Sequence, residues 1–184
     1  AEGLIAGGVL PVIKHIPGHG RAVADSHLAL PRVEASWEDL DRRDFEAFRP
    51  LSDMPMAMTA HVVYAAIDPR RPATTSRETI EKAIRGAIGF GGLLISDDLS
   101  MKALRGDLRS RARAAIGAGC DVVLHCNGDL PEMKRVAAGS RPLAGRPGSR
   151  AAAAAARLPR APEPFDVDAG RARFEAAMMR SGVP

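Results

Sequence analysis

The segment Gly92-Leu93-Leu94-Ile95-Ser96-Asp97-Asp98 joins a short apolar run to one hydroxyl and two carboxylates. Three further segments, residues 9–13, 55–60 and 121–124, are also apolar runs with polar side chains at or just beyond their ends. Continuous apolar runs of this length are typical of strands that are covered on both faces. The polar groups at the ends of the other three are Lys14-His15, Thr59-Ala60-His61 and His125-Cys126-Asn127.

Helical patterns separate the four predicted strands. Ser36-Trp37-Glu38-Asp39 resembles a capping box and begins a helix, and a second helix begins at Ser76 and ends before Gly89. Further helices are expected over about 107–117 and 131–139. Repeated strand and helix units with buried strands indicate a parallel sheet. The first strand is not followed by a Gly-x-Gly-x-x-Gly pattern, so the fingerprint of a dinucleotide-binding fold is missing.

The predicted fold is α/β and corresponds to the C-terminal half of a (β/α)8 TIM barrel. A whole barrel has eight units in about 250 residues, whereas this chain has 184 residues and about four units. We expect a partial TIM-barrel catalytic domain over 1–157, and a Pro-rich linker with a C-terminal helix over 158–184. The helix, around Ala169 to Met179, is expected to dock on the same domain. In a barrel the C-terminal strand ends meet at one face, so the four polar clusters should converge there.

Composition excludes several classes of protein. Apolar residues make up 46% and charged residues 26%, which is typical of a globular chain. No apolar run is long enough to cross a membrane, and the N-terminus does not resemble a secretory leader. The net charge of +4 comes from scattered arginines, and aromatic residues are only 4%, so we expect no nucleic-acid partner. Cys120 and Cys126 are expected to be buried free thiols, which suits the cytoplasm.

The loop after the first strand contains the candidate acid/base. Asp25 and His27 are two positions apart, so the carboxylate can orient the imidazole and favour its charged form. A chance loop pair is the alternative interpretation. Because three other polar clusters should lie at the same edge, we favour a functional pair.

Two interpretations apply to Asp97 and Asp98. Either carboxylate can cap a following helix, and one of them can instead act as a nucleophile while its neighbour anchors the loop. We expect both to hold. A carboxylate nucleophile with a separate proton donor is the arrangement of a retaining glycoside hydrolase. The five histidines near strand ends suggest zinc as an alternative, but their spacing lacks both His-x-His and His-Glu-x-x-His, so no metal is expected.

The ordered motifs resemble those of bacterial β-N-acetylglucosaminidases (β-hexosaminidases) of glycoside hydrolase family 3, of the peptidoglycan-recycling type. The resemblance extends over roughly residues 1 to 157. The motifs that carry it are Lys14 to Gly20, Asp25-Ser26-His27, Met58 to Tyr64, Ser96 to Met101 and Cys120 to Gly128.

The resemblance implies a role for each candidate residue. Asp97 would be the nucleophile, His27 the proton donor and then the proton acceptor, and Asp25 the partner of His27. Lys14 and His15 would bind the sugar hydroxyls, and the other sugar-binding residues of the family would precede residue 1. The implied substrate is terminal β-linked N-acetylglucosamine on anhydro-muropeptides during cell-wall recycling in the cytoplasm. The resemblance implies no cofactor and no metal.

Two alternatives remain open from the sequence. A phosphorylase of the same family would use phosphate in place of water, because a histidine acid/base does not repel the anion. The chain could instead be an inactive half-barrel fragment whose partner is the missing N-terminal half of the barrel, since an open sheet would expose apolar edges.

Overall fold

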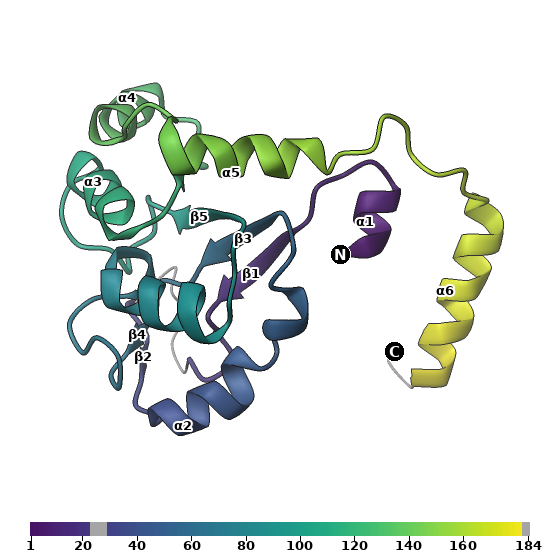
Figure 1. The fold of residues 1–184 in the computed structure, drawn as a ribbon, viewed down its shortest axis with the longest axis horizontal. Helices are drawn as coiled ribbons and strands as arrows, with labels where there is room; N and C mark the ends of the chain where they lie inside the picture. Colours follow the sequence, from purple (N-terminus) through teal and green to yellow (C-terminus); the bar gives the residue numbers. More distant parts are fainter. Residues whose placement is uncertain (23–28, 182–184) are drawn as a thin grey trace.

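A four-stranded parallel sheet forms the centre of the protein (Figure 1). The computed structural model describes residues 1–22 and 29–181. The sheet contains β1 (Val12–Ile16), β3 (Met56–Thr59), β5 (Leu93–Asp98) and β6 (Val122–Leu124), in that spatial order. Successive strands of the sheet are neighbours and run parallel, so a crossover joins each pair. This is the TIM-barrel-like α/β arrangement predicted from the four apolar runs.

Helical segments provide the crossovers between strands. After β1 come α2 (Trp37–Asp39), the π-helical η1 (Leu40–Phe45) and the 3-10 turn η2 (Arg49–Leu51). After β3 come the 3-10 turn η3 (Ala73–Thr75) and the π-helical η4 (Thr79–Ala87). The remaining helices are α1 (Glu2–Ala6), α3 (Leu108–Ala118), α4 (Leu130–Gly139), α5 (Gly145–Ala156) and α6 (Val167–Ser181).

The predicted helix starts are confirmed at both serines. The Ser36 hydroxyl accepts a hydrogen bond from the Asp39 amide, and the Ser76 hydroxyl accepts one from the Thr79 amide. Each serine therefore satisfies an amide that the first helical turn leaves without a partner.

The hydrophobic core lies between the sheet and the helices that cover its outer face. Phe45, Ile84 and Leu94 are fully buried in it, and Phe90 is 1% exposed. Burying a side chain of this size contributes about 1.5–3 kcal/mol, so these residues fix the helices on the sheet.

Two strand predictions were wrong at their boundaries. The first strand was predicted at 9–13, but β1 continues to Ile16, so Lys14 and His15 lie within it rather than after it. The third was predicted to end at Ile95, but β5 continues to Asp98, which pairs with Leu124. The pairing with β6 shifts register between Ile95 and Asp98, and within this shift the hydroxyl of buried Ser96 accepts a hydrogen bond from the Leu124 amide, so the polar residues stay attached to β6.

A second, two-stranded sheet was not predicted. It consists of β2 (Arg32–Val33) and β4 (Val63–Tyr64), which run parallel. Strands of two residues are too short to show alternation in a sequence. The small sheet joins the segment after β1 to the segment after β3, beside the C-terminal ends of those strands.

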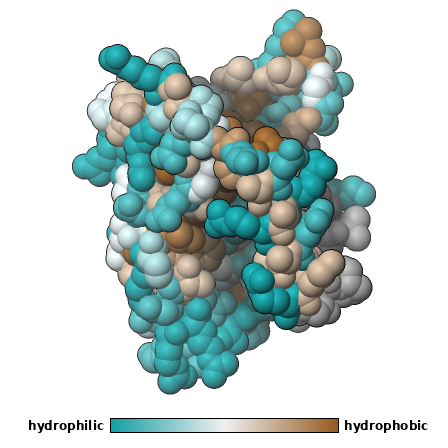
Figure 2. Space-filling view, turned by 90° about the vertical axis from the view of Figure 1, so that its right-hand side faces the viewer, coloured by the Kyte–Doolittle hydropathy of each residue, from teal (hydrophilic) through white to brown (hydrophobic). Residues whose placement is uncertain are grey.

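The C-terminal helix does not dock as expected. Figure 1 shows α6 apart from the sheet, and none of its residues is buried. Figure 2 looks onto this side of the molecule, where hydrophobic and hydrophilic residues are intermixed. Phe174 of this helix is 64% exposed. Among the described residues, no helix combines the length and apolar composition that crossing a membrane requires.

The two cysteines differ in their surroundings. Cys120 is buried before β6, as predicted, and burial raises its thiol pKa to about 12. Cys126 is exposed, which is contrary to the prediction, because the chain leaves the sheet after Leu124. Both are free thiols.

Candidate active site

The C-terminal ends of β1 and β5 bring His15 and Asp97 together. The His15 Nε2 atom lies 3.6 Å from Asp97 Oδ2, and the two side chains are 28% and 14% exposed. The ring of His19 lies 5.6 Å from that of His15, centroid to centroid. The convergence predicted for these two strand ends is therefore present, and Asp97 remains accessible at the surface of the cluster.

Burial sets the charge state of His15. It lowers the pKa of the imidazole below its ordinary value of 6.5; the Asp97 carboxylate opposes this shift, and the Lys14 ammonium adds to it. At neutral pH the ring is therefore uncharged and has one donor and one acceptor nitrogen. Lys14 itself is exposed. A cation and a neutral imidazole at this strand end are suited to binding hydroxyl groups.

Asp97 and Asp98 make different contacts. One oxygen of Asp97, Oδ1, accepts a hydrogen bond of 2.8 Å from the Asp98 amide, while Oδ2 faces His15. The Asp98 carboxylate accepts from the Ser100 amide at 3.0 Å and from the Ser100 hydroxyl at 2.6 Å. Asp98 thus anchors the following loop, as expected. No helix begins here, so the capping interpretation was wrong: α3 begins ten residues later, and Asp107 caps it.

His61, at the end of β3, joins two strand ends. Its Nε2 atom lies 3.0 Å from the carbonyl oxygen of Asp98, and its Nδ1 atom lies 2.7 Å from the hydroxyl of Thr74. Burial lowers the pKa of His61, so the ring is neutral at pH 7. Because a carbonyl oxygen only accepts, the proton is on Nε2, which donates to Asp98, while the Thr74 hydroxyl beside Nδ1 also contacts the carbonyl oxygen of Ala60. His61 is fully buried and fixes the end of β5 that bears Asp97.

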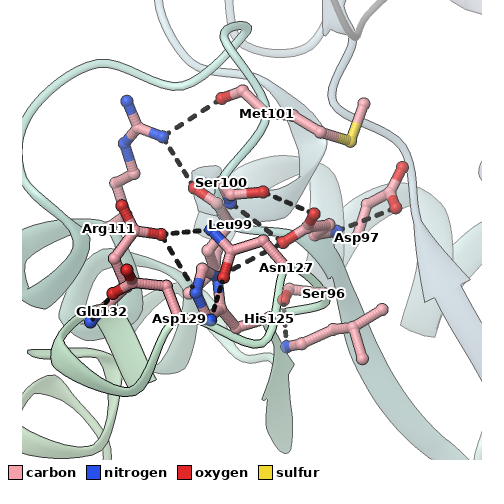
Figure 3. A network of polar contacts seen from close by, with 12 residues as sticks. Ser96, Asp97, Leu99, Ser100, Met101, Arg111, His125, Asn127, Asp129 and Glu132 are labelled. Atoms are coloured by element: carbon pink, nitrogen blue, oxygen red, sulfur yellow. Dashed lines mark hydrogen bonds and ion pairs between the residues drawn. The ribbon is translucent and has the colours of Figure 1, made fainter. Parts of the chain in front are cut away.

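His125, after β6, lies between two carboxylates (Figure 3). Its side chain is 4% exposed, with Nδ1 at 3.6 Å from Asp98 Oδ1 and Nε2 at 3.2 Å from Glu132 Oε2. Within the described part of the chain, neither nitrogen is aligned for a hydrogen bond. Asn127 also contacts Glu132, so the loop after β6 is attached to the end of β5 through this group.

The turn after β1 is held by three side chains. Gly18 has a φ of +140°, and a Cβ there would lie 3.1 Å from that of Asp44. Its carbonyl oxygen accepts a hydrogen bond of 2.5 Å from the buried Tyr64 hydroxyl. Arg21 forms a 2.7 Å ion pair with the same Asp44. The turn that leads toward residue 23 is therefore fixed to the small sheet and to η1.

Two predicted site residues cannot be placed. Asp25 and His27 lie outside the described residues, so the structure does not show where they stand relative to Asp97. Tyr64 and Asp44 were not among the predicted site residues. The signal for them in the sequence is Gly18, because a turn at this glycine needs support from a neighbouring element. Among the described residues, no three histidine, cysteine or acidic side chains are grouped so as to hold a metal ion.

Known proteins are similar to this chain in sequence. The family model described as the glycosyl hydrolase family 3 N-terminal domain matches residues 1–155. A protein named β-hexosaminidase from Methylobacillus flagellatus is 45% identical over 130 residues, which are 68% of this chain and 37% of that protein. The β-hexosaminidase of Neisseria gonorrhoeae is 43% identical over 68% of this chain and 36% of its own length. The chain thus spans less than two fifths of these curated relatives.

Solved structures are also similar. A family 3 β-N-acetylglucosaminidase from Paenibacillus sp. aligns with a TM-score of 0.73 at 34% identity, over 82% of this chain and 31% of that one. NagZ from Neisseria gonorrhoeae in complex with N-trifluoroacetyl-D-glucosamine aligns with a TM-score of 0.58 at 33% identity, over 82% of this chain and 51% of that one.

Proposed function

The chain belongs to glycosyl hydrolase family 3, and from this membership we propose that it carries the catalytic residues of a retaining β-N-acetylhexosaminidase. The observation that supports the proposal most directly is the position of Asp97. One of its oxygens is held by the Asp98 amide, while the other faces His15 at the end of the parallel strands. That end is where enzymes with this fold place their catalytic groups.

In the proposed mechanism Asp97 Oδ2 attacks the anomeric carbon. The bond from that carbon to the leaving oxygen breaks, and His27 gives its proton to the leaving oxygen. A covalent glycosyl-enzyme forms. His27 then takes a proton from water as the water attacks the same carbon, which restores Asp97 and retains the configuration. Asp25 would orient His27 by accepting a hydrogen bond from its ring.

Lys14 and His15 are proposed to bind the hydroxyls of the sugar. His15 is half-buried next to Asp97, so a hydroxyl bound to its ring would lie near the attacking oxygen. Its neutral ring can donate to one hydroxyl without adding charge beside the nucleophile.

The proposed substrate is terminal β-linked N-acetylglucosamine on anhydro-muropeptides, and the proposed setting is peptidoglycan recycling in the cytoplasm. Relatives named β-hexosaminidase and a NagZ structure with an N-acylated glucosamine derivative support the sugar part of this proposal.

Asp97→Asn tests the nucleophile in the full protein. Because an amide oxygen is a poor nucleophile, we expect hydrolysis of an aryl N-acetylglucosaminide to fall by about a thousandfold or more. With a slow-turnover substrate the wild-type protein should gain the mass of one N-acetylglucosaminyl group, on the peptide that contains Asp97. Asp53→Asn, on an exposed carboxylate of the same chain, is the matched control and should leave the rate unchanged.

Two further measurements complete the test. His27→Ala should slow substrates with poor leaving groups most, because only these need the proton. Added phosphate should not appear in the product; a glycosyl phosphate would identify a phosphorylase instead. Wild-type turnover by Asp97→Asn, or labelling of a different carboxylate, would contradict the assignment.

A further inference from the structure

A cavity outside the candidate active site lies beside the loop that follows β5. Its volume is about 640 Å³, which is within the range of small-molecule sites. The cavity is lined by residues of β2 and β4, the segment after β4, the segment 103–105 after β5, and one face of α3. None of the candidate site residues Lys14, His15 or Asp97 lines it.

Positive charge is concentrated in this cavity. No aspartate or glutamate is among its lining residues, whereas arginines line it from every side. These arginines are Arg32, Arg70, Arg71, Arg77, Arg105 and Arg111. Elsewhere among the described residues several arginines pair with carboxylates, for example Arg42 with Asp39 and Arg85 with Asp121, whereas no carboxylate lines this cavity.

Three of the six guanidinium groups are held in position by main-chain carbonyl oxygens. These are Arg32, Arg77 and Arg111, and each keeps part of its donor fork for other partners. Immobilised guanidinium groups lose little entropy when they bind an anion. The acceptors are the carbonyl oxygens of Pro69, Gly117, Leu99, Met101 and Gly106, at 2.7 to 3.1 Å.

The other three arginines make no side-chain hydrogen bond or ion pair among the described residues, although, against the effect of burial, the charge of Arg71 helps to lower the pKa of Asp68. These are Arg70, Arg71 and Arg105, and all three side chains are exposed. Nearby carboxylates are already engaged. Glu34 pairs with Arg32, Glu81 pairs with Arg77, and Asp68 accepts from the Ser76 hydroxyl and from the amides of Arg70 and Arg71.

Arg70, Arg105 and Arg111 form no ion pair among the described residues, so their like charges repel one another around the cavity, and an anion there reduces that repulsion. Guanidinium groups bind phosphate and carboxylate oxygens in a bidentate manner, which gives both affinity and orientation. The walls between the arginines are apolar and include Leu30, Val63 and Leu104. A ligand that fits them therefore combines an apolar part with several negative groups.

We propose that this cavity is a binding site for a small organic ligand that bears at least two oxyanion groups, either phosphates or carboxylates. The site does not depend on the proposed hydrolase activity, because its lining shares no side chain with the candidate active site. It does adjoin the same loop, since Arg111 holds the carbonyl oxygens of Leu99 and Met101 just after β5 (Figure 3).

Calorimetric titration of the full protein tests the proposal, with pyrophosphate and citrate as probes and N-acetylglucosamine as the neutral comparison. We expect at least one oxyanion probe to bind, and its affinity to fall as salt is added. The triple variant Arg70→Gln, Arg71→Gln, Arg105→Gln should weaken binding by about tenfold or more. These side chains form no hydrogen bond or ion pair among the described residues, so their removal leaves no acceptor unsatisfied.

The matched control is Arg109→Gln, Arg113→Gln, Arg160→Gln, which removes the same charge from exposed side chains outside the cavity. The affinity of this control variant for the oxyanion probes should stay within about twofold of the wild-type value.

Binding of only one probe identifies the oxyanion, phosphate or carboxylate. Failure of both probes to bind, or equal weakening by the two triple variants, would overturn the site. If the triple variant does not fold, Arg105→Gln alone should still weaken binding several-fold, and an unchanged affinity would overturn the proposal.

Discussion

Two adjacent aspartates have different environments, and this difference separates their roles. Burial acts to raise the pKa of Asp98, but hydrogen bonds from the hydroxyl and amide of Ser100 outweigh it and the pKa is lowered. Asp98→Asn weakens these charge-assisted bonds, so we expect the free energy of unfolding to fall by about 1–2 kcal/mol. Activity should fall in part, because the loop after Asp97 loosens. Urea denaturation and kcat measure the two effects.

Asp97→Asn should show the opposite pattern in the same two measurements. Its carboxylate accepts one hydrogen bond from a neighbouring amide, and an amide oxygen can still accept it. Stability should therefore change little while activity is lost. If Asp98→Asn proved as inactive as Asp97→Asn at unchanged stability, Asp98 would not be an anchor.

The sequence predicted that one of these carboxylates would anchor the loop, but not the polar contacts that support them. His61 was singled out only by its place near a strand end, and its bond to the Asp98 carbonyl depends on how β3 and β5 are aligned. His125 was likewise noticed, but Glu132 was not, because it approaches from the next helix. Contacts of this kind arise from tertiary structure and leave no periodic signal.

At the scale of the elements, one buried carboxylate joins several of them. Asp121, which precedes β6, is 2% exposed at its side chain and forms 2.9 Å ion pairs with Arg85 of η4 and Arg150 of α5. It also accepts from the Leu94 amide at the start of β5. Asp121→Asn leaves both partly buried guanidinium groups without their counter-charge, so we expect a loss of about 3 kcal/mol in the free energy of unfolding.

An exposed pair in the same chain is the control for Asp121. Asp53 lies 3.9 Å from Arg157, and its side chain is 73% exposed. Asp53→Asn should change the free energy of unfolding by less than about 0.5 kcal/mol. Equal effects of the two substitutions in chemical denaturation would show that Asp121 does not link the elements.

Elements were predictable where one face or both faces are buried. The four strands of the large sheet could be predicted because continuous apolar runs are typical of strands covered on both faces. The starts of α2 and η4 appear because Ser36 and Ser76 are capping residues. Strand ends were wrong where buried polar residues continue the strand, as at Ser96. The helix α5 begins at Gly145, six residues before its run of six alanines.

At the scale of the whole molecule, buried ionisable groups set the dependence of stability on pH. Burial lowers the pKa of His15 and His61 below 6.5, so between the lowered pKa and 6.5 the unfolded chain binds more protons than the native one. Stability should therefore fall as the pH drops below about 6.5. Asp68 and Asp98 also have lowered pKa values, so a further loss should follow as the pH falls below about 3.8.

On the alkaline side the sign of the proton linkage is reversed. Burial raises the pKa of Cys120 from 9.0 to about 12 and raises that of Tyr64 above its ordinary value, so the native chain keeps protons that the unfolded chain releases. Stability should therefore be highest between about pH 6.5 and 9 and should fall above that window. Denaturation midpoints across pH at constant ionic strength measure the profile in the full protein. Cys120→Ala should reduce the alkaline loss because it removes one of the groups whose pKa folding raises. A stability that rises from pH 7 to 5, or an alkaline limb unchanged in Cys120→Ala, would contradict this account of the buried groups.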